Sequence, residues 1–210
     1  MRTYLIASAV LTVFIAIALI PNVVDGRVKD TPHNLNLVGG ITVTNDEVCR
    51  PCHAPHNTSI EGGYLWNHEL TTATFTVHDG ATSDDVINST SRLCLSCHDG
   101  TVALDSYGGG PLSPTVLIDG SDLLGTDLTD DHPVGVMYPA PGTFGYQEPD
   151  VDGNIVSDET PAFSSAHLED GRVQCVSCHF AHGSRATYGM FLRVDNTGSA
   201  LCMTCHITPG

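Results

Sequence analysis

Cysteine and histidine are the residue types of this chain whose spacing can do chemistry. The chain contains 8 cysteines and 11 histidines. Every cysteine belongs to a Cys-x-x-Cys pair, and a histidine directly follows each pair. The four units are Cys49-Arg50-Pro51-Cys52-His53, Cys94-Leu95-Ser96-Cys97-His98, Cys175-Val176-Ser177-Cys178-His179 and Cys202-Met203-Thr204-Cys205-His206. No cysteine is left over, and a shuffled chain of this composition would contain almost no such unit.

The Cys-x-x-Cys-His pattern is the one by which haem c is attached to protein. Two cysteines three positions apart on a helical turn face the same way. They can therefore form thioether bonds to the two vinyl groups on one edge of the macrocycle. The adjacent histidine then binds the iron as its proximal ligand. The sequence predicts four haem c groups, with the proximal ligands His53, His98, His179 and His206.

Three other uses of paired cysteines fit the pattern less well. Disulfides are the usual state of an even number of cysteines in an exported protein, but they need no histidine after each pair. A zinc site uses Cys-x-x-Cys pairs, yet four-coordinate closure does not call for a histidine beside every one. A thioredoxin-like pair would occur once and within a βαβ pattern, which is absent around these motifs.

Four irons also need a second axial ligand each, and seven histidines lie outside the motifs. Five of them are candidate distal ligands: His33, His56, His68, His132 and His182. His78 resembles a turn residue and His167 an exposed one. His56 and His182 each lie three residues beyond a proximal histidine. That is too short a distance to reach the far face of the same haem, so we expect each to bind a neighbouring iron, with haems close together.

The supply of histidine favours iron with histidine on both faces, which is low-spin, low in potential and without an open site. Met137 and Met190 could supply thioether ligands, but the histidines make them unnecessary. Five candidates for four irons leave one histidine over. It is either a spare or a ligand to an iron in another molecule.

The charge of the chain restricts its partners. Asp and Glu number 24 against 8 Lys and Arg, which gives a net charge of −16. This excludes nucleic acid, whose phosphates would repel the protein, and argues against binding to anionic lipid. Asp150-Val151-Asp152-Gly153-Asn154 resembles the start of a calcium loop, but Ile155 and Pro161 break the EF-hand pattern. An acidic turn is the better interpretation, with calcium as the alternative.

The N-terminus has the pattern of an export signal. Arg2 precedes an uncharged run from Tyr4 to Ile20, and small residues before Arg27 offer a cleavage point. We therefore expect residues 1–26 to be a cleaved signal peptide and residues 27–210 to be one tetrahaem domain. The alternative is an uncleaved anchor, although the run is short for a membrane span. Cleavage would leave no stable span and a protein in the periplasm or at the outer surface.

Glycine (21 residues) and proline (12 residues) are scattered along the chain. The sequence predicts a mostly irregular, loop-rich fold with short α-helices on the motifs, few short β-strands, and haems in place of much of the core. We expect helices over Glu169–Ser177 and Ser199–Cys205, and strands over Ile41–Thr44 and Thr72–Val77. Because the haems would supply so much apolar surface, the chain without haem should be largely unfolded.

Several strings beyond the attachment motifs resemble one family. They are Cys-His-Ala-Pro-His, Leu65-Trp66-Asn67-His68, Cys94–Ala103, Asp131-His132-Pro133-Val134-Gly135 and Leu201–His206. Together they are similar to the tetrahaem cytochromes of metal-reducing bacteria, and in particular to the OmcE-like outer-surface cytochromes that polymerise into conductive filaments. The resemblance implies stacked bis-histidine haems, self-association, and a histidine that ligates a haem of the next subunit; His33 or another terminal residue would suit that role.

The expected function is electron transfer, with redox proteins or extracellular electron acceptors as partners. Two alternatives to a filament subunit remain: a soluble periplasmic shuttle, and a multihaem reductase. The reductase needs one iron with an open position, which the number of spare histidines disfavours. We therefore expect an electron carrier and not an enzyme.

Overall fold

A computed structural model describes residues 28–41, 43, 47–56, 58, 61–108, 116–155, 166–182 and 189–207. The expected signal segment, residues 1–26, lies outside the described residues. Within the described ranges, no helix is long and apolar enough to cross a membrane.

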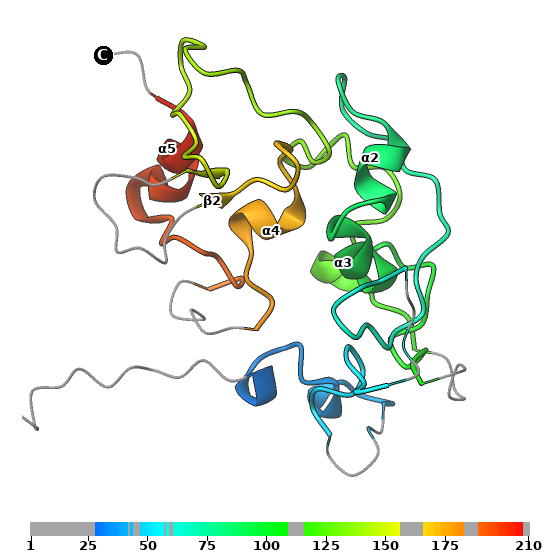
Figure 1. Cartoon of the computed structure of the whole chain (residues 1–210). Helices are drawn as coiled ribbons and strands as arrows, with labels where there is room; N and C mark the ends of the chain where they lie inside the picture. The colour runs from blue at the N-terminus through cyan, green and yellow to red at the C-terminus, as the bar shows by residue number, and fades with distance from the viewer. Residues whose placement is uncertain are drawn as a thin grey trace, which may run out of the picture.

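Short elements separated by long irregular segments make up the fold (Figure 1). In chain order they are η1 (Val28–Asp30), η2 (Leu35–Leu37), α2 (Ser83–Ile87), α3 (Ser91–His98), η4 (Gly120–Asp122), β1 (Asn154–Ile155), β2 (Ala166–His167), α4 (Cys175–Cys178), η6 (Thr197–Ser199) and α5 (Ala200–Cys205). The strands β1 and β2 pair antiparallel, with Asn154 opposite His167. The loop-rich class predicted from the sequence is confirmed.

Helices carry three of the four attachment motifs. The second motif lies on α3, the third on α4 and the fourth on α5, whereas the first forms a hydrogen-bonded turn. The longest run of helical residues in the described ranges consists of α2 and α3, which residues 88–90 separate. It starts at a capping box, in which Thr82 and Asp85 satisfy each other's main-chain N–H groups.

The apolar core is divided into three small clusters, each beside a motif. Phe75, Val86, Leu95 and Leu128 surround α3. A second cluster of Tyr138, Ile155, Ala166 and Leu168 packs against Cys205, and a third of Ile41, Val43 and Leu104 packs against Cys97. Each cluster is therefore small and lies against an attachment motif.

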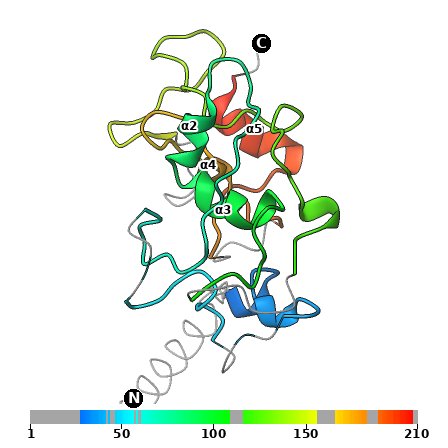
Figure 2. The same cartoon turned by 90° about the vertical axis from the view of Figure 1, so that its right-hand side faces the viewer.

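The two halves of the chain meet where α3 and α4 touch. The buried side chain of Gln174 donates to the main-chain oxygen of Asp85 at 2.9 Å and accepts from the hydroxyl of Ser91 at 2.7 Å. The same hydroxyl accepts from the N–H of Cys175 at 3.0 Å. In both views α4 therefore lies between α3 and α5, which places the third motif between the second and the fourth (Figure 1 and Figure 2).

Three local predictions from the sequence are wrong and one is right. The helix expected over Glu169–Ser177 begins only at Cys175, because Glu169 and Arg172 close a tight turn first. The described residues within Ile41–Thr44 form no strand, and Thr72–Val77 contributes a single bridge, from Thr76 to Asp127. The helix expected over Ser199–Cys205 is α5 with its preceding turn.

Candidate haem-binding sites

Each attachment motif closes as one turn of helix. The histidine N–H donates to the carbonyl of the first cysteine, at 2.8 Å in the first motif, 3.0 Å in the third and 2.9 Å in the fourth. The second motif lies wholly within α3. This turn puts the two cysteines of a motif on one side, as attachment to one edge of a macrocycle requires.

The motifs also approach one another in chain order. The thiols of Cys94 and Cys175 lie close enough to interact, and this interaction raises the pKa of Cys94 well above its usual value and lowers the pKa of Cys175 to about 7. Burial raises the pKa of Cys97, and the charge of Cys52 raises it further. Burial also raises the pKa of Cys178, and the charges of Cys175 and Cys202 raise it further. The attachment points therefore run from the first motif to the fourth as a chain of neighbours.

Main-chain carbonyls fix three proximal histidines. The Nδ1 atom of His53 lies 2.9 Å from the carbonyl oxygen of Tyr64, that of His98 lies 2.7 Å from Asp122, and that of His179 lies 2.7 Å from Met190. A carbonyl at Nδ1 requires a proton there, so Nε2 is left as the unprotonated nitrogen. This is the arrangement by which proteins orient a metal-binding imidazole.

Three proximal histidines face a second histidine across a narrow gap. The ring centres of His33 and His98 are 6.3 Å apart. Those of His53 and His182 are 6.0 Å apart, and those of His132 and His206 are 6.5 Å apart. Each pair joins a motif histidine to a candidate distal histidine from a distant part of the chain.

These separations fit one iron between two imidazoles. A metal–nitrogen bond to histidine is about 2 Å long, and the ring centre lies about 1.2 Å behind the nitrogen, so two such rings should be about 6.4 Å apart. Burial lowers the pKa of His33, and the neighbouring His98, His182 and His179 add to the effect. Lowering keeps the imidazole neutral, which is the form that binds a metal. The donor set and spacing therefore fit haem c.

His179 and His56 are left out of these pairs. Among the described ring contacts, none joins His179 to a second histidine, and the side chain of His56 is exposed. His179 does lie close enough to His33 to lower its pKa. The third motif thus has a proximal histidine whose ring makes no contact with a second histidine ring among the described residues.

His68 has a different environment from the other candidates. Its side chain is only 3% exposed, with Nδ1 2.8 Å from the carbonyl of Glu69 and Nε2 3.0 Å from that of Ala103. A neutral imidazole has a single N–H, so it can donate to only one of them. The structure does not bring His68 to a proximal histidine; its neighbour in the motifs is the sulfur of Cys97, at 3.6 Å.

The residues that the sequence disfavoured as ligands have other contacts. His78 faces the carbonyl of Asp131 through Nε2 at 2.9 Å, and His167 faces the side chain of Asn154 through Nδ1 at 3.0 Å. Met137 and Met190 are exposed. Met190 contributes its carbonyl oxygen to His179, which sequence reasoning had not considered.

The Asp150 turn is a closed hydrogen-bonded unit. One carboxylate oxygen accepts from the N–H groups of Asp152 at 2.9 Å and Asn154 at 2.8 Å. These bonds, chiefly that from Asn154, lower the pKa of Asp150. The described residues contain no cluster of three or more His, Cys, Asp or Glu able to hold a metal ion. The acidic-turn interpretation therefore accounts for this segment.

The structure reveals an internal repeat that the motifs alone did not predict. The third motif repeats the first motif at a distance of 126 residues along the chain. The repeat includes the extra histidine of Cys-His-x-x-His and a glycine, Gly63 or Gly189, that precedes the loop packed against the motif. In both copies this loop has two consecutive non-glycine residues with positive φ, and its first carbonyl meets the proximal histidine. The residue after that histidine donates to the next carbonyl, at 3.0 Å from Ala54 to Leu65 and 2.7 Å from Phe180 to Phe191.

The second and fourth motifs form the other half of the repeat. Both read Ser-x-Leu-Cys-x-x-Cys-His, at Ser91–His98 and Ser199–His206, and both are helical. The chain therefore contains one pair of motifs twice, which we call doublet one (Cys49–His98) and doublet two (Cys175–His206). The signal in the sequence was the shared Cys-His-x-x-His and Ser-x-Leu-Cys strings.

Comparison with known families agrees with this division. The family model described as "Doubled CXXCH motif" matches residues 167–209, which contain doublet two and cover about a fifth of the chain. The match supports a multihaem c-type cytochrome. It implies covalently bound haem c with iron and suggests haem-based electron transfer. A search of the curated proteins finds no match for the chain.

Proposed function

We propose that this protein transfers electrons through four haem c groups, one at each Cys-x-x-Cys-His motif, and that it is an exported protein. The observation that carries the proposal is the set of three imidazole pairs 6.0–6.5 Å apart. Doublet one supports two further haems, at the first and second motifs, because its first motif repeats the main-chain contacts of the third.

Haem iron supplies one-electron chemistry when bound. The chain would hold the macrocycles through eight cysteines and orient the imidazoles through carbonyls at Nδ1. Cys52 is near enough to Cys97, Cys175 to Cys94, and Cys202 to Cys178 to shift the pKa of each, and this proximity supports a linear route in chain order. The acidic surface suits basic redox partners.

The two doublets support self-association into a filament. His182 of doublet two pairs with His53 of doublet one. The equivalent of His182 in doublet one is His56, which is exposed, and the equivalent of His53 in doublet two is His179, which lacks a described distal histidine. We propose that His56 of one copy binds the iron held by His179 of the next. Such a head-to-tail contact builds a filament where the rotation between successive copies does not close into a ring.

The filament is tested with the variant His56→Ala. We expect the holoprotein to lose its self-association and one haem in four to lose its sixth ligand, since the missing imidazole comes from another copy. Sedimentation with electron microscopy measures the first effect and the high-spin ferric signal the second. His78→Ala is the matched control. Unchanged filaments in His56→Ala, or monomers at all concentrations in the unmodified holoprotein, would refute the filament.

A reductase is the second candidate function. It is favoured by His179, which has no second histidine beside it among the described ring contacts. If the iron at His179 kept an open position in the assembled protein, it could bind a small substrate. The holoprotein should then show a high-spin ferric signal and bind nitrite or hydroxylamine at one haem in four. We expect neither, because His56 would fill the position.

A further inference from the structure

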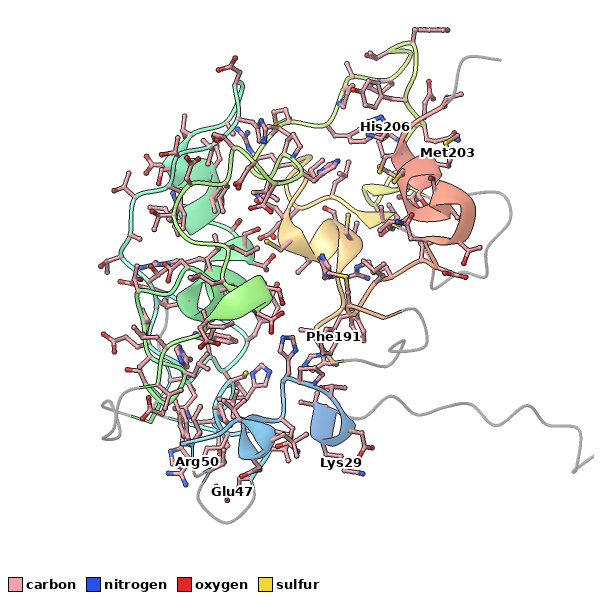
Figure 3. All side chains as sticks on the ribbon, turned by 180° about the vertical axis from the view of Figure 1, so that it is seen from behind. Lys29, Glu47, Arg50, Phe191, Met203 and His206 are labelled. Carbon is pink, nitrogen blue, oxygen red and sulfur yellow. The ribbon has the colours of Figure 1, made fainter. Side chains whose placement is uncertain are left out.

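The imidazole of His33 is held by residues of doublet two. Its ring is stacked on the ring of Phe191, with centres 4.3 Å apart and an angle of 15° between the planes. Its Nδ1 atom lies 3.1 Å from the carbonyl oxygen of Ala181. Because the carbonyl holds one edge of the imidazole and the phenyl group covers one face, the two contacts fix the plane in which the imidazole lies. Figure 3 shows Phe191 where the N-terminal segment approaches the chain that follows α4.

The opposite imidazole, that of His98, is held separately. Its Nδ1 atom faces the carbonyl of Asp122 at 2.7 Å, so the Nε2 atoms of His33 and His98 are both left unprotonated for a metal. The planes of these two rings differ by 72°. The rings of His53 and His182, at the first motif, differ by only 31°. The candidate axial imidazoles of the second motif are therefore nearly perpendicular, whereas those of the first are closer to parallel.

The main chain of Phe191 is fixed by the third motif. The N–H of Phe180 donates to the carbonyl of Phe191 at 2.7 Å, and Nδ1 of His179 lies 2.7 Å from the carbonyl of Met190. Met190 and Phe191 both have a positive φ, of 45° and 57°. The same turn therefore orients two histidines that belong to different motifs. Met190 orients the proximal histidine of the third motif, and the ring of Phe191 orients the distal candidate of the second.

The internal repeat separates the side chain of Phe191 from the turn that carries it. The equivalent residue in doublet one is Leu65, which also has a φ of 57° and accepts from the N–H of Ala54 at 3.0 Å. Leu65 has no ring to stack and is 56% exposed. Because both copies form the turn, the turn itself does not require an aromatic side chain. The ring of Phe191 is thus available for a separate role at His33.

The angle between two axial imidazoles changes the energy levels of the iron between them. Each imidazole donates π-electron density to the iron d orbital that is directed out of its own ring plane. Two parallel rings act on one d orbital and separate it from its partner, whereas two perpendicular rings act on different orbitals and leave them close in energy. The separation stabilises the ferric ion, so perpendicular rings raise the potential, which is one way in which axial ligands tune haem. Ferric iron with close-lying orbitals also gives an electron paramagnetic resonance signal at an unusually large g value.

We propose that Phe191 is a positioning residue, which holds the imidazole of His33 nearly perpendicular to that of His98 and so raises the potential of the second haem. A residue of doublet two thereby tunes a haem of doublet one. The inference rests on the proposed function, because it needs a haem at Cys94 and Cys97 with both imidazoles on its iron.

The variant Phe191→Leu tests this role, because leucine is the residue that the repeat places in the same turn. In the oxidised holoprotein, the large-g signal of one haem in four should move to lower g, and one midpoint potential should fall. Phe191→Tyr should keep both at their original values, since its ring can stack in the same way. Phe144→Leu is the matched control, at a phenylalanine that is 85% exposed. An unchanged spectrum in Phe191→Leu, or a high-spin signal in place of the shifted one, would contradict the positioning role.

A second measurement uses the unmodified holoprotein and so does not depend on the folding of Phe191→Leu. In the diamagnetic ferrous state, phenylalanine labelling with Phe191→Tyr for assignment identifies the ring signals of Phe191. We expect nuclear Overhauser effects from these signals to the imidazole protons of His33. Contacts of Phe191 with no axial imidazole, or only with that of another haem, would overturn the proposal. Peptide mapping of the same sample distinguishes this result from failure of the proposed function, which would leave Cys94 and Cys97 without haem and refute both.

Discussion

Without haem, the chain is expected to be largely unfolded. The helices that carry the motifs have 8, 4 and 6 residues, which is too short for stability in isolation. The three apolar clusters contain 4, 4 and 3 buried residues. Meanwhile, large apolar side chains such as Phe144 and Met190 are 85% and 79% exposed. The polypeptide alone therefore buries too little apolar surface to offset its conformational entropy.

The expected loss is the whole free energy of unfolding, about 5–15 kcal/mol for a typical domain. Circular dichroism and hydrogen exchange of chain produced without haem attachment measure it, and both should report a largely unfolded polypeptide. A variant lacking only the fourth site, Cys202→Ala with Cys205→Ala, is the control and should lose the α5 region while keeping the rest. A cooperative unfolding transition in the haem-free chain would contradict the proposed role of haem in the core.

Loss of His182 should change one haem in four. Its ring lies 6.0 Å from that of His53, so His182→Ala removes the imidazole opposite the first proximal ligand. The first iron should become high-spin in the ferric state. Its potential should rise by on the order of 100 mV, because axial ligands set haem potentials over a wide range. Electron paramagnetic resonance and a redox titration measure these two effects.

Chemical rescue makes this test specific. Added imidazole should return the first haem of His182→Ala to the low-spin state, which a general loss of structure would not allow. His167→Ala, at a histidine shortly before doublet two, is the matched control, since His167 faces Asn154 and not a motif histidine. Four low-spin haems with unchanged potentials in His182→Ala would disprove the pairing of His182 with His53.

Most of the features that could be predicted, namely the attachment motifs and the loop-rich fold, follow from local patterns in the sequence. The attachment motifs follow from residue types a few positions apart, and the loop-rich fold from scattered glycine and proline. The short span between His179 and His182 also predicted a ligand that reaches another site. The structure brings His182 to the first motif, which lies 126 residues before the third motif, to which His182 is adjacent in the sequence.

Long-range contacts were beyond the sequence. The carbonyls that meet Nδ1 of His53 and His179 belong to Tyr64 and Met190. Both residues have a positive φ, which their residue types do not predict. The strand expected over Thr72–Val77 had the right pattern but only one bridge partner, at Asp127. His68 resembled a ligand in sequence, whereas its nitrogens face the carbonyls of Glu69 and Ala103.

The number and position of covalent haems is the most direct test of the account. Intact mass spectrometry of the holoprotein, followed by peptide mapping, measures both. We expect four haem masses, one on each of the peptides that contain Cys49 and Cys52, Cys94 and Cys97, Cys175 and Cys178, and Cys202 and Cys205. Free thiols or disulfides at these positions, with no added haem mass, would contradict it.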